Sequence, residues 1–211
     1  SHLTGEVWAK DIARMQIDNS AYFAQTRREW LVGTGSRPLA WALRNLVYGH
    51  KVFPEGTIYN ETEEYNFGVM PNGTAYADLL ELVITDLVTV IEDTGQLPGD
   101  QPVWQAQILE GLIMAYESGA LERSLNERAL NAIKASLAYF DDNHIRAQGD
   151  SAYEIVYDSG NSDWADAANY GWFWVNNYAW AGQHIDEHYS KKAGALISWL
   201  TDTYQSPEYH T

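Results

Sequence analysis

The residues best suited to binding and catalysis lie late in the chain, between positions 163 and 188. Residues 172–180 read WFWVNNYAW and are followed by Gln183 and His184, so amides, a phenol and an imidazole stand among indole rings within roughly three helical turns. Large rings with a polar handle stack on sugars and line grooves, although they fill hydrophobic cores more often. The candidate substrate-binding rings of this region are Trp164, Trp172, Trp174 and Trp180.

Over about ten residues, this region resembles the Asn-Asn-His-x-x-Trp segment of helical-toroid polysaccharide lyases, with Tyr178 in the position of the family's histidine. The resemblance implies that Asn177 neutralises a uronate carboxylate and that Tyr178 or His184 transfers the α-proton of the sugar. Such a proton is removed only when the neighbouring carboxylate is hydrogen-bonded and a base lies within hydrogen-bond reach. The resemblance also implies a helical fold, of which this chain would form a partial version.

A second motif, HIDEH, covers residues 184–188. On a continuous helix, His184 and His188 would lie one turn apart on the same side, a spacing that suits a transition metal. The motif resembles the H-x-x-E-H signature of inverzincin metallopeptidases, and this resemblance implies that both histidines bind the metal and that Glu187 is the general base. The alternative is that the two imidazoles are partly buried and hydrogen-bonded within the fold.

The acidic residues around Asp163 support further hypotheses. A glycosidase needs two carboxylates about 5 to 10 Å apart, and Asp163, next to Trp164, is the candidate catalytic acid of this region, with Asp166 and Glu154 nearby. The acidic stretch 158–166 could instead ligate a divalent cation such as Ca²⁺, or Asp163 could cap a helix. Because the chain has 29 acidic residues, the sequence does not select one carboxylate pair.

Charge is unevenly distributed along the chain. Asp and Glu outnumber Lys and Arg by 29 to 13, and the net charge of −16 argues against nucleic acid or an anionic membrane as a partner. No Lys or Arg occurs between Val52 and Glu122. Arginines near the N-terminus either pair with this acidic region or converge on an anionic sugar, because guanidinium groups match carboxylates. The arginines considered are Arg27, Arg28, Arg37 and Arg44, of which Arg28 and Arg44 are the candidate substrate-binding residues.

Helices must position these groups. Apolar spacing predicts a helix over 75–93, a second over 101–117 capped by Asp100, and a third whose capping box runs from Ser124 to Glu127. Less regular patterns predict helices over 9–30 with a break, 38–48, 163–180 and 185–204. Two long loops are expected at 51–73 and 143–162, the second with a short strand at 152–157.

We therefore expect one all-α domain over residues 1–211, with about seven helices in packed hairpins that form an (α/α)-type bundle or a partial toroid. The chain has no cysteine and no apolar stretch long enough to span a membrane. The expected function is action on a polysaccharide, as a lyase or hydrolase of an acidic glycan. The alternatives are a noncatalytic recognition module of a larger secreted enzyme and a histidine-based metalloenzyme. The expected partner is a carbohydrate, and the expected location is extracellular or periplasmic, with no export signal visible.

Overall fold

The computed structural model describes residues 5–34, 37–53, 75–99, 101–148, 152–155 and 164–205. In these ranges the chain forms eight helices and one antiparallel pair of short strands. The elements in order are α1 (Gly5–Thr26), α2 (Arg28–Thr34), α3 (Arg37–Val52), α4 (Tyr76–Thr94), α5 (Pro102–Glu117), α6 (Arg123–Asn143), β1 (Ile145–Gln148), β2 (Ala152–Ile155), α7 (Trp164–His184) and α8 (His188–Gln205). The all-α prediction is confirmed. The count rises from about seven to eight because the break expected within 9–30 falls at Arg27 and separates α1 from α2.

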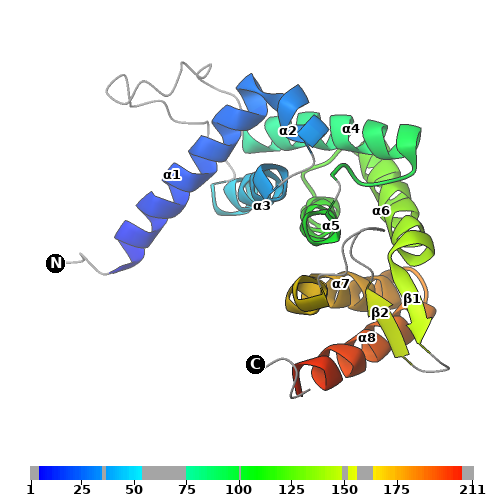
Figure 1. The fold of residues 1–211 in the computed structure, drawn as a ribbon. Coiled ribbons are helices and arrows are strands. Elements are labelled where there is room, and N and C mark those ends of the chain that lie inside the picture. The colour runs from blue at the N-terminus through cyan, green and yellow to red at the C-terminus, as the bar shows by residue number, and fades with distance from the viewer. Residues whose placement is uncertain are drawn as a thin grey trace.

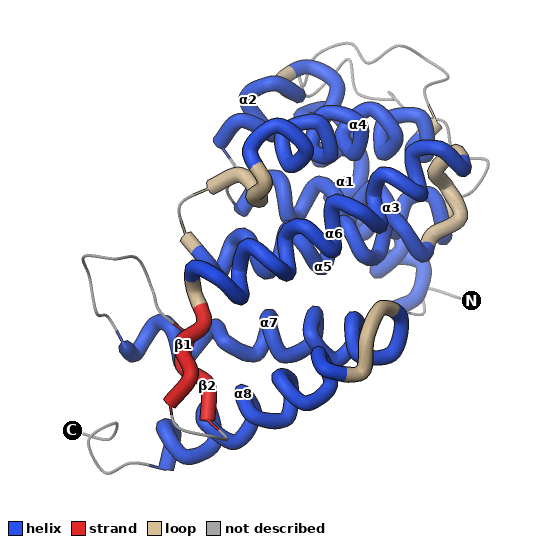
Figure 2. Tube along the Cα trace, turned by 90° about the vertical axis from the view of Figure 1, so that its right-hand side faces the viewer, coloured by secondary structure: helices blue, strands red, loops and turns tan. Residues whose placement is uncertain are grey.

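The helices form two packed layers. In the first layer, α3 packs between α1 and α5, and α5 packs against α7. In the second layer, α4 packs against α6. Helix α8 also belongs to the second layer and packs along α7 of the first layer. Figure 1 shows α4, α6 and α8 following an outer arc, with α3, α5 and α7 inside it. Figure 2 shows α7 and α8 lying along one another, with the β1–β2 pair at one end of the molecule.

Helix α4 shows how the apolar spacing of the sequence becomes a buried stripe. Its side chains from Leu79 to Ile91 that follow helical spacing are buried against the other layer. The helix ends at Gly95, whose φ of 75° is left-handed and whose N–H donates to the carbonyl of Ile91 at 2.8 Å. A glycine takes this conformation without steric cost, so the end of the helix is encoded locally.

The two predicted N-caps differ from the structure. Gln101 is the N-cap residue of α5 and makes no capping side-chain hydrogen bond, while Asp100 lies outside the described residues. Helix α6 begins at Arg123, so the capping box predicted from Ser124 to Glu127 is wrong. The N–H of Glu122 donates instead to the carboxylate of Glu81 on α4, at 2.7 Å. A contact with another helix therefore provides a hydrogen-bond acceptor for an N–H group at this helix terminus. The local sequence cannot reveal such a contact.

Nearly all of the described buried apolar residues belong to one cluster that extends from α1 to α8. Among its largest side chains are Trp174, Tyr76, Tyr178 and Phe140. The rings of Phe140 and Trp174 are stacked, with centroids 3.4 Å apart and planes 16° apart. Much of the aromatic content thus serves to join α6 to α7. No helix in the described ranges combines the length and apolarity needed to cross a bilayer.

The predicted second loop contains the short strand expected at 152–157, observed as β2. It pairs with β1, with Ile145 opposite Ile155, and β2 packs against α8. Of the first predicted loop, 51–73, residues 51–52 instead form the end of α3, and residues 54–73 lie outside the described residues.

Candidate functional site

Three residues predicted to contact substrate are interior. Trp174, Asn177 and Tyr178 lie on the side of α7 that is enclosed by neighbouring helices. The indole N–H of Trp174 donates to the carbonyl of Pro102 at 3.0 Å, and the amide of Asn177 donates to the carbonyl of Ala106 at 2.8 Å. The predicted catalytic roles of Asn177 and Tyr178, and the predicted sugar contact of Trp174, are therefore wrong. Their polar atoms join α7 to its neighbours, because a buried polar group needs a partner.

Tyr178 takes part in a buried polar cluster. Its hydroxyl donates to one carboxylate oxygen of Asp141 on α6, and the ammonium of Lys192 on α8 pairs with the other oxygen. Burial first, and then the charge of Asp141, raise the pKa of Tyr178 well above its usual value. The raised pKa favours the neutral phenol, which is the form that donates the hydrogen bond to Asp141. The phenol connects α6, α7 and α8.

The two histidines of the HIDEH motif do not share a helix. Helix α7 ends at His184 and α8 begins at His188. Asp186 accepts the backbone N–H of His188 at 2.9 Å, and its carboxylate also lies 2.9 Å from Nδ1 of the same residue. A turn therefore interrupts the continuous helix on which the predicted metal pair of His184 and His188, with Glu187 as base, depended. Within the described ranges, no group of three or more His, Cys, Asp or Glu side chains is placed to hold a metal ion.

The arginines predicted to converge on an anion bind separate partners. Nε of Arg28 lies 2.6 Å from the carboxylate of Asp86 on α4, and Arg44 pairs with Glu110 on α5. The guanidinium of Arg37 lies over the ring of Trp104, 4.4 Å from its centroid. The alternative that these arginines pair with the acidic region is confirmed for Arg28 and Arg44. The predicted anion clamp is not formed by them.

The structure does bring Trp180 and His184 together, and it adds Glu117 from α5. The indole N–H of Trp180 donates to Oε1 of Glu117 at 2.6 Å, and Nε2 of His184 lies 3.9 Å from the same oxygen. The imidazole stacks on the indole, with centroids 4.8 Å apart and planes 15° apart. Tyr116 meets the indole edge-on at 5.9 Å. We call Glu117, Trp180 and His184 the Glu117 corner.

The side chains of the Glu117 corner are open to solvent. Those of Glu117 and His184 are each nearly half exposed. A carboxylate beside an imidazole can transfer a proton, and an adjacent indole can hold a sugar ring. Sequence reasoning missed Glu117, which lies 63 residues before Trp180. The available signal was its place at the end of a predicted helix, and nothing in the sequence pairs that helix end with Trp180.

The Glu117 corner belongs to a larger surface. On α3, three exposed side chains and the partly buried Arg44 follow one helical stripe, and Arg44 pairs with Glu110 of α5. Glu110, Met114 and Glu117 follow one stripe on α5, and the last of them binds Trp180 of α7. These contacts join three stripes into one surface, which we call the three-helix face. It consists of Arg37, Trp41, Arg44 and Tyr48 on α3, Glu110, Met114 and Glu117 on α5, and Trp172, Asn176, Trp180 and His184 on α7.

The remaining predicted residues are Trp172 and Trp164 of α7 and, outside the described residues, Asp163. Trp172 is 41% exposed, as a sugar-contacting ring would have to be. Trp164 is the first residue of α7, and Asp163 lies outside the described residues. The roles predicted for Trp164 and Asp163 remain predictions.

Comparison with known proteins adds no relative: no protein-family model, no curated protein and no solved structure matches this chain.

Proposed function

We propose that this protein recognises a neutral polysaccharide on the three-helix face. The observation that carries the proposal is the exposure of aromatic rings on α3 and α7, the two helices that flank α5 in one layer. Trp41 and Tyr48 on α3 are each about half exposed, and Trp172 on α7 is also exposed. An aromatic ring exposed to water lacks contacts with apolar groups. A sugar ring that stacks on it supplies such contacts.

Polar groups stand beside these rings, as carbohydrate recognition requires. Arg37 lies 5.8 Å from the ring centroid of Trp41, and the exposed amide of Asn176 is one helical turn from Trp172. A sugar presents hydroxyl groups around an apolar ring face, so a site with both features matches its chemistry. The face thus offers stacking and hydrogen bonding together.

Charge favours a neutral chain over an acidic one. Arg44 is paired with Glu110, so its charge is offset, and Glu117 adds a second carboxylate to the face. The net charge of the chain is −16, which repels a polyanion at a distance. The acidic glycan expected from the sequence required a free arginine cluster, and Arg28 and Arg44 do not supply one.

The direct test is a binding panel. The protein would be run in affinity gels that contain soluble neutral polysaccharides, such as xylan, mannan or mixed-linkage glucan, and in parallel gels with polyuronates. We expect retardation by at least one neutral chain and weaker retardation by polyuronates. Unchanged mobility across the neutral panel would overturn the proposal.

A matched pair of variants locates the binding surface. Trp41→Ala removes a ring of the three-helix face that is 52% exposed, whereas Trp30→Ala removes an equally exposed ring, at 49%, from α2. We expect the first variant to weaken polysaccharide binding by about tenfold and the second to leave it unchanged. Equal losses in both variants would show that binding occurs elsewhere.

Glycosidic cleavage at the Glu117 corner is a second candidate function. It is favoured by the imidazole of His184 and the indole of Trp180, which meet on one carboxylate oxygen of Glu117. In such a reaction, a proton donor assists departure of the leaving sugar while water adds to the other sugar. New reducing ends from a bound polysaccharide, abolished in Glu117→Gln with binding retained, are the expected result. If no new reducing ends appear, cleavage is contradicted and recognition is the only one of the two functions that remains.

A further inference from the structure

A groove lies on the other layer of the molecule, between the first halves of α4 and α6. Its volume is about 430 Å³, a size typical of ligand sites. It is separate from the three-helix face, which is built on α3, α5 and α7. The lining residues are Asp78, Glu81, Leu82, Thr85, Glu122, Ser124, Leu125 and Arg128.

The lining of the groove combines apolar and acidic groups. Leu82 lines the groove and is 44% exposed. Its side chain has no polar atom that could hydrogen-bond to water, so this exposure leaves an apolar patch in the groove. Three acidic residues, Asp78, Glu81 and Glu122, line the groove together with Leu82. Glu81 uses one carboxylate oxygen to accept the backbone N–H of Glu122. The negative charge of the groove is thus held in place by the packing of α4 on α6.

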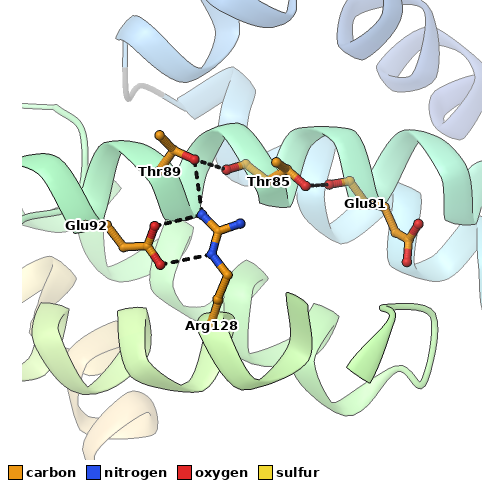
Figure 3. A network of polar contacts seen from close by, with 5 residues as sticks. All are labelled: Glu81, Thr85, Thr89, Glu92 and Arg128. Atoms are coloured by element: carbon orange, nitrogen blue, oxygen red, sulfur yellow. Dashed lines mark hydrogen bonds and ion pairs between the residues drawn. The ribbon is translucent and has the colours of Figure 1, made fainter. Parts of the chain in front are cut away.

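The one cation of the lining is already engaged. Nε and Nη2 of Arg128 donate to the two carboxylate oxygens of Glu92, at 3.0 and 2.7 Å, and Nη2 also lies 3.3 Å from the hydroxyl of Thr89 (Figure 3). Glu81 lies further along α4, beyond Thr85, in the same view. The bonds from Arg128 lower the pKa of Glu92, so this pair is charged at neutral pH. Since Arg128 is satisfied by Glu92, it leaves the other three carboxylates to a ligand.

We propose that this groove docks a basic peptide segment of a partner protein. The long stems of arginine or lysine would cover Leu82, while their cationic ends reach Asp78, Glu81 and Glu122. Charge complementarity carries the assignment. No Lys or Arg occurs from Val52 to Glu122, a stretch that supplies α4 and one wall of the groove. The resulting field attracts a cationic segment before contact.

The test uses a fluorescein-labelled peptide of alternating arginine and leucine, with an arginine-to-glutamate version as the negative peptide. Its binding to the intact chain would be followed by fluorescence anisotropy. Asp78→Asn removes one charge inside the groove, whereas Asp93→Asn removes the same charge from the opposite end of α4. We expect about threefold to tenfold weaker binding for the first variant and a change of less than about twofold for the second. Unfolding by urea checks that both variants are folded.

A third variant separates docking from general charge attraction. Leu82→Ser keeps every charge and removes the exposed apolar contact, so the arginine–leucine peptide should bind it about threefold to tenfold more weakly. Equal losses in Asp78→Asn and Asp93→Asn, or full binding by Leu82→Ser, would overturn the proposal. Displacement of the peptide by an equal concentration of spermidine would also overturn it, because the groove would then select a small amine.

Discussion

Tyr178 places a hydroxyl group where three helices meet. It donates to Asp141 on α6, and Asp141 also pairs with Lys192 on α8. Both Asp141 and Lys192 are largely buried, so each depends on the other and on the phenol for the interactions that water would otherwise supply. At the scale of single residues, the chemistry-bearing groups of α7 therefore divide in two. Those on the buried side hold the hairpins together, and those on the exposed side are free to meet a ligand.

Removing this hydroxyl tests the structural role of Tyr178. We expect Tyr178→Phe to lower the free energy of unfolding by about 1.5 to 3 kcal/mol, because a buried carboxylate loses a hydrogen bond. Urea denaturation monitored by circular dichroism measures the change. Tyr48→Phe, at an exposed position on α3, is the matched control and should change stability by less than about 0.5 kcal/mol. Equal stability of Tyr178→Phe and the wild type would contradict the bonding described here.

At the scale of elements, glycine allows α5 to approach α3 closely. A Cβ atom added to Gly111 would lie 2.8 Å from Cβ of Leu43, which is shorter than a normal contact. Helix α5 lies between α3 and α7, and most of its side chains are buried. Close packing on both of its sides leaves α5 only a narrow exposed stripe, which contributes Glu110 and Glu117 to the three-helix face. The close approach therefore also sets the spacing of the face.

Alanine substitution separates this packing effect from helix propensity. Alanine favours a helix by about 1 kcal/mol over glycine, but overpacking of a core typically costs about 1 to 3 kcal/mol. We expect Gly111→Ala to be destabilised by up to about 2 kcal/mol net. Gly194→Ala on α8, where an added Cβ meets nothing within 4 Å, should be stabilised by about 0.5 to 1 kcal/mol. Thermal unfolding of the two variants shows whether each substitution raises or lowers the stability of the protein. A stabilised Gly111→Ala would contradict the observed packing.

At the scale of the whole molecule, the two layers present different surfaces. The inner layer carries exposed rings beside the Arg44–Glu110 ion pair, and the outer layer carries an acidic groove with an apolar patch. A net charge of −16 acts over the whole surface and affects any charged partner. Binding on the two layers should therefore respond differently to salt, since screening weakens attraction between charges and leaves stacking almost unchanged.

Salt dependence distinguishes the two proposals in one series of measurements. Between low and high sodium chloride, we expect the affinity for the arginine–leucine peptide to fall by about tenfold or more. The affinity for a neutral polysaccharide should change by less than about twofold. Anisotropy and affinity gels at each salt concentration provide the two readouts. A peptide affinity that does not depend on salt would contradict charge complementarity, and a steep decline for the polysaccharide would contradict recognition by stacking.

The sequence by itself determined the helices, because their signals are local. The spacing from Leu80 to Ile91 predicts α4 to within one residue at each end, and Gly95 marks where it stops. The strand β2 and the break between α1 and α2 were also predictable, since turn residues and loss of periodicity lie in the segments themselves. The fold class depends on these local signals and was accordingly predicted.

Only the tertiary structure decided which side chains face solvent. A helix such as α7 carries aromatic and amide residues on every side, so its sequence does not say that Tyr178 is enclosed while Trp172 is exposed. That outcome depends on where α5 and α8 pack, and it also brings Glu117 to Trp180 across 63 positions of sequence. The physical reason is that burial follows from contacts among distant segments, whereas helix formation follows from neighbours one turn apart.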